Sequence, residues 1–302
     1  MHCTSCLQQV HRNGSVTYAH QMLGAARLHP DRRAVIPLMP EPIGPHDGTG
    51  TKDGERHAAK RCVATRRQDH PHLQFLVTDD RLRATAPHIE TLQDHALHSI
   101  RGVTEGDHAF LFQQVQVAEH AGRVTYDARH DRAAGVVHRL RLVHDMPLHA
   151  SNPHVRVKVI AYGEIGPHRV QPLSWVTDLR VRKRNVYHRM RGGRARWKIE
   201  NETCNTLKNQ GDHFEHTDGH GEQHRSVVCA MLMLLAFLVD QTQQLCCALL
   251  QAVWAQLGSK RLLWERLRAL FYDDALQSMR QLRATLFYGL KKGQPLWAVD
   301  SS

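Results

Sequence analysis

The sequence predicts an α/β fold with a mixed sheet, and three stretches of the chain lead to this prediction. Up to about residue 107, short β-branched runs alternate with helical patterns. Between residues 108 and 173, short apolar runs separated by glycine and proline indicate antiparallel strands. The last third is predicted to be helical. We therefore expect the first part of the core at 1–107, a β-rich insertion at 108–173, a return strand and a long helix at 174–240, and a helical C-terminal region at 241–302.

Within the first segment, strands are expected at 15–26 and 34–39, a helix at 55–68, a strand at 73–78, a helix at 87–97 and a strand at 99–103. Pro40 and Pro42 are expected to close the second strand, and Asp53 to cap the first helix. Asp79 and Asp80 follow an apolar strand directly. Open α/β sheets place ligands and catalytic groups just past such strand ends. The start of an ordinary loop is an equally good interpretation.

The β-rich insertion carries many arginines and histidines. Its expected strands are at 124–126, 136–143 and 155–162, and 110–117 fits a helix or a strand. A basic sheet of this kind can lie on DNA or form a solvated surface. After a return strand at 174–179, Asn185 is expected to cap a long basic helix. The C-terminal helices are expected at 227–239, 245–257, 262–271 and 276–290.

Net charge and composition indicate which class of partner and which cellular setting to expect. The 302 residues carry a formal net charge of +11 with a pI of about 9.6, which favours nucleic acid over a membrane surface. The most apolar run, Ala230 to Val239, is shorter than the ~20 residues that cross a bilayer, so it is expected to be a core helix. No signal peptide is visible, and seven cysteines without a disulfide framework indicate a reducing, cytoplasmic setting.

Two groups of metal-binding residue types are present. Cys3 and Cys6 form a C-x-x-C motif with His11 and His20 further on, but the spacing is a poor match to zinc sites, and a zinc protein is the less favoured interpretation. Four more histidines lie in a glycine-rich loop that cannot hold them in one helical frame, which disfavours a metal cluster. They are His213, His216, His220 and His224.

The stretch Arg194 to Lys208 is predicted to be one basic helix. Arg196 and Glu200 are four residues apart and would share a face of it. A pair of this kind is commonly only a solvated surface, whereas Glu200 can also be a metal ligand. The residues alone leave both alternatives open.

Several strings resemble one family. They are His20-Gln-Met-Leu-Gly-Ala, Pro40-Glu-Pro-Ile, Glu55-Arg-His-Ala-Ala-Lys-Arg61, His70-Pro-His-Leu leading to Asp80, Ala86-Pro-His-Ile, Gly106-Asp-His, Ser174-Trp-Val-Thr-Asp-Leu, Arg196-Trp-Lys-Ile-Glu-Asn-Glu and Asn205-Thr-Leu-Lys-Asn-Gln-Gly. The chain resembles bacterial insertion-sequence transposases of the DDE type, in the group whose last acidic residue lies in an Arg-Trp-x-Ile-Glu helix. The resemblance runs from about Cys3 to the C-terminal helices.

The resemblance implies an RNase H-like core that binds transposon ends and performs DNA transposition. In such a core, two aspartates on strands and a glutamate on a late helix hold two Mg²⁺ or Mn²⁺ ions for phosphodiester cleavage and strand transfer. Carried over to this sequence, Asp80 matches the second aspartate and Glu200 the glutamate, both as catalytic residues and as metal ligands. DNA-binding roles fall to Arg196 and Lys208, and to the adjacent Arg194 and Lys198. Assembly into a homo-oligomer, or into a mixed oligomer with an intact transposase, is expected.

Glu202 competes with Glu200 for the metal role. The commoner family spacing places the lysine seven residues after the glutamate, whereas Lys208 lies eight residues after Glu200 and six after Glu202. The Arg-Trp-x-Ile-Glu string decides for Glu200.

The main departure from the family concerns the first aspartate, which belongs on a strand before Cys3, where this chain has two residues. Asp47 and Asp53 do not match its motif. We therefore expect an RNase H-like core without its first strand, in a truncated copy that binds DNA but has lost cleavage. The alternative is a non-catalytic basic DNA-binding or regulatory protein that acts on an intact transposase.

Overall fold

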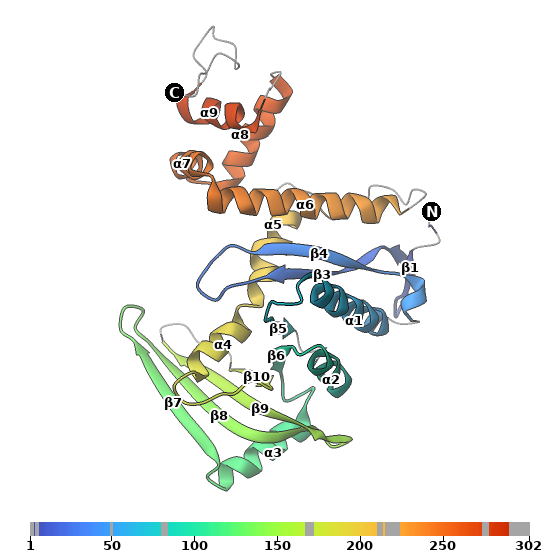
Figure 1. Ribbon diagram of the computed structural model, residues 1–302, viewed down its shortest axis with the longest axis vertical. Coiled ribbons are helices and arrows are strands. Elements are labelled where there is room, and N and C mark those ends of the chain that lie inside the picture. The colour runs from blue at the N-terminus through green and yellow to red at the C-terminus, as the bar shows by residue number, and fades with distance from the viewer. Residues whose placement is uncertain are drawn as a thin grey trace. The chain divides into compact units, whose positions relative to one another are not determined.

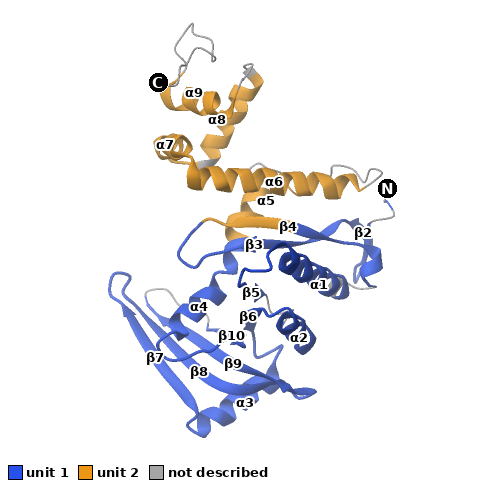
Figure 2. Ribbon diagram, viewed as in Figure 1, with its two compact units in different colours: residues 1–33, 40–199 blue, residues 34–39, 200–302 orange. Residues whose placement is uncertain are grey.

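The computed structural model describes residues 3, 6–48, 51–79, 84–166, 172–209, 214, 224–273 and 278–289 (Figure 1). The chain forms two compact units (Figure 2). The first consists of Met1–Arg33 and Pro40–Ile199, and the second of Ala34–Met39 and Glu200–Ser302.

The first unit contains a mixed six-stranded sheet, which confirms the predicted α/β class. Its strand order is β5-β6-β10-β9-β8-β7. The strands are β5 (Leu76–Asp79), β6 (His98–Val103), β7 (Val124–Asp131), β8 (Val136–His149), β9 (Asn152–Ile165) and β10 (Leu173–Thr177). β5 and β6 are parallel, and the remaining neighbours are antiparallel. The β-rich segment β7 to β9 therefore extends the same sheet that carries β5.

The sheet contributes buried side chains to a core on each of its faces. Alternate residues of a strand point to opposite sides, so one strand can supply both cores. Val157 and Val159 of β9 join the core that includes residues of α2 (Ala86–Asp94) and α3 (Ala109–His120). Ile160 and Tyr162 join the core beneath α4 (Val186–Arg194). Each such fully buried side chain contributes roughly 1.5–3 kcal/mol. Residues 110–117, which fitted a helix or a strand, lie within the helix α3.

The N-terminal segment forms two small sheets and a helix. The elements are β1 (Leu7–Val10) paired with β2 (Val16–Ala19), β3 (Gln21–Arg27) paired with β4 (Ile36–Ile43), the 3₁₀ turn η1 (Pro45–Asp47) and α1 (Thr51–Asp69).

Three expectations for this segment are wrong. β4 continues through Pro40 and Pro42, because a strand in a two-stranded sheet has one side on which no N–H is needed. His20 divides the expected strand 15–26 into β2 and β3. Asp53 lies in the first turn of α1 and does not precede it, because the helix begins at Thr51.

The second unit contains the C-terminal helices. They are α5 (Asn205–Asn209), α6 (Arg225–Cys246), α7 (Ala248–Leu257), α8 (Lys260–Asp273) and α9 (Met279–Tyr288). Their core lies between α7, α8 and α9, where Leu250, Val253, Leu263 and Leu282 are buried. Within α8, the buried residues Leu263, Leu267 and Leu270 recur at helical spacing.

Helix α6 differs from the expected core helix. It has 22 residues, and only 11% of its most apolar window is buried. Among the described residues it is the one helix that is long and apolar enough to cross a membrane by length and composition. Core helices of soluble proteins meet the same criterion, so this property alone does not assign α6 to a membrane.

Candidate functional site

The carboxyl end of β5 carries Asp79, whose side chain lies in an internal ionic cluster. Its Oδ2 atom is 3.0 Å from Nε2 of His88 in α2 and 3.4 Å from Nε of Arg101 in β6. Arg101 is fully buried. A buried arginine needs a compensating charge beside it, so Asp79 has a structural role. Asp80, the predicted ligand, lies outside the described residues.

The predicted continuous helix from Arg194 to Lys208 is interrupted. α4 ends at Arg194, the π-helical turn η3 covers Ile199–Cys204, and α5 follows directly. Between α4 and η3 the backbone bonds are of the i to i+3 type, from the amides of Lys198 and Ile199 to the carbonyls of Ala195 and Arg196. Paired glycines weaken the end of α4, since glycine costs about 0.8–1 kcal/mol in a helix. The helix tightens at that end and widens into a π turn immediately afterwards.

Both competing glutamates lie in this π turn. Glu200 is exposed and Glu202 is half-buried. The backbone carbonyl of Glu202 accepts a hydrogen bond from Thr206 Oγ1 at 2.8 Å. π-helical turns are rare and are frequently found at functional sites.

Asn185, expected to cap the basic helix, precedes α4 without capping it. Its Oδ1 accepts from the backbone amide of Arg182 at 2.7 Å, and its Nδ2 donates to the carbonyl of Arg180 at 3.1 Å. The side chain thus fixes the turn that leads into α4.

The four predicted DNA-binding residues differ in their surroundings. The ammonium of Lys198 donates to the carbonyl oxygens of His29, Pro30 and Arg32 at 2.7, 2.9 and 2.6 Å. Three carbonyls surround this charge, as is typical of a structural lysine. Lys208, in contrast, is exposed on α5.

Arg194 and Arg196 also have different neighbours. Arg194 places NH1 3.3 Å from Oε2 of Glu164 and 3.3 Å from the hydroxyl of Tyr162. Arg196 lies with its guanidinium carbon 5.7 Å from the ring centre of Trp197, which is 50% exposed. An exposed aromatic side chain beside an arginine is a combination that stacks on nucleic-acid bases.

The contacts of Arg194 belong to a polar network on β8 and β9. The hydroxyl of Tyr162 donates to Glu164 at 2.7 Å and lies 2.7 Å from Nδ1 of His138. Burial and, after it, the hydrogen bond to Glu164 raise the pKa of Tyr162. The same hydrogen bond, followed by the charge of Arg194, lowers the pKa of Glu164. The network therefore holds Tyr162 protonated and Glu164 ionised at neutral pH.

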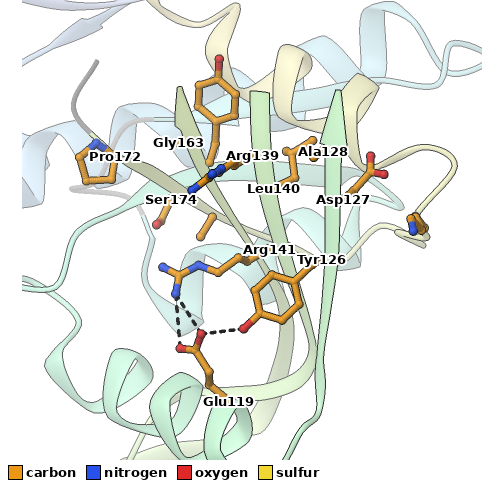
Figure 3. A pocket seen from close by; sticks show the side chains of 13 residues that line it. Glu119, Tyr126, Asp127, Ala128, Arg139, Leu140, Arg141, Gly163, Pro172 and Ser174 are labelled. Atoms are coloured by element: carbon orange, nitrogen blue, oxygen red, sulfur yellow. Dashed lines mark hydrogen bonds and ion pairs between the residues drawn. The ribbon is translucent and has the colours of Figure 1, made fainter. Parts of the chain in front are cut away.

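A hollow of about 720 Å³ lies on the sheet over β7, β8 and β9 (Figure 3). Its lining includes three small residues: Ala161 and Gly163 of β9, and Ser174 of β10, which pairs with Ala161. At one side Glu119 of α3 accepts a hydrogen bond from Tyr126 at 2.8 Å and pairs with Arg141 at 3.3 Å. The hydrogen bond from Tyr126 is the main cause that lowers the pKa of Glu119.

Three of the six arginines that the structure describes in the β-rich segment are paired with nearby acids. Arg141 pairs with Glu119, Arg129 lies 3.4 Å from Asp127, and Arg156 lies 2.7 Å from Asp145. Such exposed pairs add only ~0–1 kcal/mol each to stability, but they cancel local positive charge. Where these three pairs lie, the surface therefore carries less net positive charge than its arginine content implies.

The N-terminal segment brings together three metal-binding side chains. The sulfur atoms of Cys3 and Cys6 are 3.5 Å apart, and Nε2 of His20 lies 3.4 Å from the first and 3.7 Å from the second. Burial raises the pKa of the Cys6 thiol. The sequence contained the C-x-x-C signal, but the convergence of His20 depends on strand pairing that spacing did not reveal. Of the four loop histidines, three lie outside the described residues and only His224 is described.

A scan against protein-family models finds no matching family, and a search of the curated proteins finds no significant match. The fold and the site therefore define only a class, a basic α/β protein with a mixed six-stranded sheet.

Proposed function

We propose that the chain is a DNA-binding protein related to DDE transposases, with an RNase H-like core. The observation that carries the proposal is the position of Glu200, exposed in a π-helical turn between the basic residues Arg196 and Lys208. The order of elements supports it as well. The strand β5, which pairs in parallel with β6, ends at Asp79, an antiparallel β segment follows, and the acidic turn comes last.

The π turn also accounts for the unusual spacing between Glu200 and Lys208. A π turn closes its hydrogen bonds to the fifth residue, where an α-helix closes them to the fourth. It therefore takes up one additional residue. Lys208, eight residues after Glu200, then occupies the place of the seventh residue in a regular helix. This relation supports Glu200 over Glu202 as the family's acidic residue.

The resemblance assigns the metal-ligand role to the carboxylates of Asp80 and Glu200. Carboxylate oxygens suit a hard divalent cation such as Mg²⁺ or Mn²⁺. The side chain of Asp79, the residue before Asp80, is engaged by His88 and Arg101. When bound, such ions activate a water or a 3′-hydroxyl and stabilise the leaving oxygen. Two carboxylates, Asp80 and Glu200, are matched to the family's motif. A site with only these two of the three DDE carboxylates would bind DNA without cutting it, and this is the form of the proposal that the cleavage assay tests.

DNA binding is tested by fluorescence anisotropy with a labelled duplex at several salt concentrations. Each phosphate contact contributes about 0.9 to the slope of log K against log salt. Arg196→Ala and Lys208→Ala are each expected to lower that slope by about this amount. Arg12→Ala removes an equal charge from the exposed N-terminal hairpin and serves as the control. No binding at low salt, or equal slopes in all three variants, would reject the proposal.

Cleavage is tested separately with a nicking and strand-transfer assay on a terminal-repeat substrate with Mg²⁺ or Mn²⁺. No product is expected. Product that disappears in Glu200→Gln but not in Glu202→Gln would show a working site and overturn the cleavage-deficient part of the proposal.

The alternative, a regulatory protein that acts on an intact transposase, predicts a mixed oligomer. Co-purification of a tagged full-length transposase with this chain tests it. No association of the two chains would reject the regulatory role and leave the DNA-binding proposal intact.

A further inference from the structure

We propose that Cys3, Cys6 and His20 form a zinc site that closes the base of the N-terminal hairpin. The three ligand atoms all lie within 4.8 Å of one another. Two thiolates and one imidazole are ligands that favour zinc over Mg²⁺. The site is therefore separate from the carboxylates of the proposed DDE chemistry.

Strand pairing explains why these residues meet. β1 pairs with β2 so that Leu7 is opposite Ala19. The next pair along this register is Cys6 and His20, which places their side chains at the open end of the hairpin. The backbone amide of Cys6 donates to the carbonyl of Cys3 at 3.2 Å, a bond that holds Cys3 close to Cys6.

The distances agree with a tetrahedral zinc site. With Zn–S bonds of about 2.3 Å and Zn–N bonds of about 2.0–2.1 Å, neighbouring ligand atoms lie roughly 3.5–3.8 Å apart. The observed separations are 3.5 Å between the sulfurs, and 3.4 and 3.7 Å from Nε2 of His20 to Cys3 and Cys6. A disulfide would need a separation of about 2.05 Å. Tetrahedral zinc takes a fourth ligand, which water or a further side chain would supply.

The hairpin itself needs such a link. All of β2 is exposed, as is β1 apart from Leu7, which is half-buried. Two-stranded hairpins of this kind are marginally stable in water at best. A structural zinc ion contributes folding free energy directly, because the preformed site exists only in the folded chain. Zinc would supply the stability that an apolar core does not supply here.

The experiment measures zinc in the full-length protein, purified without chelators, by inductively coupled plasma mass spectrometry. One equivalent per chain is expected in the parent protein, with loss to background in Cys6→Ser and His20→Asn. Cys246→Ser and His72→Asn change an exposed cysteine and an exposed histidine elsewhere and should retain the full equivalent. Substoichiometric zinc in the parent, or full zinc in both site variants, would overturn the proposal.

Measurements on the parent protein keep the test valid if a site variant does not fold. Modification of the thiols with a mercurial should release one equivalent of zinc to a metallochromic dye. Protein loaded with Co²⁺ should show thiolate-to-cobalt charge-transfer absorption. Absence of both signals would reject the site. Neither measurement involves DNA, so the result does not depend on the proposed function.

Discussion

Gly193 lies against the indole of Trp175 so closely that a Cβ atom at Gly193 would be 2.7 Å from Trp175 Nε1 and 2.9 Å from Cγ2 of Ile100. Both neighbours belong to the buried core beneath α4, so neither can move away without repacking. Gly193→Ala should therefore lower the free energy of unfolding by about 1–3 kcal/mol, the usual cost of overpacking. Urea denaturation of the full chain measures the change.

The adjacent Gly192 provides the matched control. A Cβ there would be 3.6 Å from Cδ1 of Ile100 and 3.9 Å from Cδ2 of Leu76, which are ordinary contacts. Alanine also has a helix propensity about 0.8–1 kcal/mol better than glycine. Gly192→Ala should be neutral or stabilising. Equal destabilisation by the two substitutions would contradict the packing described for α4.

A second prediction concerns Asp47, which links η1 to α1. Its side chain is 3% exposed, and its Oδ2 accepts from the amide of Gly44 at 2.9 Å and from NH2 of Arg61 at 3.1 Å. Asp47→Asn keeps the shape but removes the charge that Arg61 contacts, and should cost about 1–3 kcal/mol. Asp53→Asn, at an exposed carboxylate beside Arg56, should change stability by no more than about 0.5 kcal/mol. Thermal and urea denaturation of both variants provide the comparison.

The same carboxylate predicts a pH dependence. The hydrogen bond from Arg61 lowers the pKa of Asp47 below its ordinary value of 3.8. The stabilisation is therefore complete above the pKa of the unfolded chain, and it is lost as the pH falls from about 4 through the lower folded pKa. The stability difference between the parent and Asp47→Asn should shrink over that range. A difference that stays constant from pH 7 to pH 3 would contradict this assignment.

The sequence predicted each strand of the six-stranded sheet at about its observed place but underestimated the length of β7, β8 and β9. The prolines expected to separate the strands of the β-rich segment include Pro147 and Pro153, yet these two lie inside β8 and β9. The register between these strands shifts around Pro147, and such bulges accommodate a residue without an N–H. Whether a proline can lie inside a strand depends on how that strand pairs with its neighbours. The local sequence pattern does not reveal this pairing.

The candidate site was only partly predictable for the same reason. The helical stretch around Glu200 follows from local pattern, but a π turn depends on which carbonyl each amide selects. The carbonyl partners of Lys198 lie 166 to 169 residues away along the chain. From the sequence alone, Lys198 is therefore predicted to contact DNA, because the carbonyl groups that bind its ammonium are not visible in the local pattern.

A third prediction separates Lys198 from Arg196. Lys198→Met removes three hydrogen bonds to backbone carbonyls and should lower the free energy of unfolding by about 1–3 kcal/mol. It should leave the salt dependence of DNA binding unchanged, because the ammonium is directed at the protein. Arg196→Ala should lower the salt slope of DNA binding by about 0.9, the contribution of one phosphate contact. Denaturation and anisotropy titrations on both variants test this. A reduced salt slope in Lys198→Met would show that this lysine contacts phosphate directly.

The last prediction concerns Tyr162 at alkaline pH. Tyr162→Phe removes the hydroxyl that donates to Glu164 and lies beside His138, and should cost about 1–3 kcal/mol at pH 7. Burial, with Glu164, raises the pKa of Tyr162 above its value in the unfolded chain, about 10. This stabilisation is therefore present below pH 10 and is lost as the pH rises through the higher folded pKa. The stability difference between the parent and Tyr162→Phe should consequently shrink above pH 10. Tyr272→Phe, at a fully accessible tyrosine, should show no difference at either pH. If the Tyr162→Phe difference grows above pH 10, the hydroxyl does not donate to Glu164 in the folded protein.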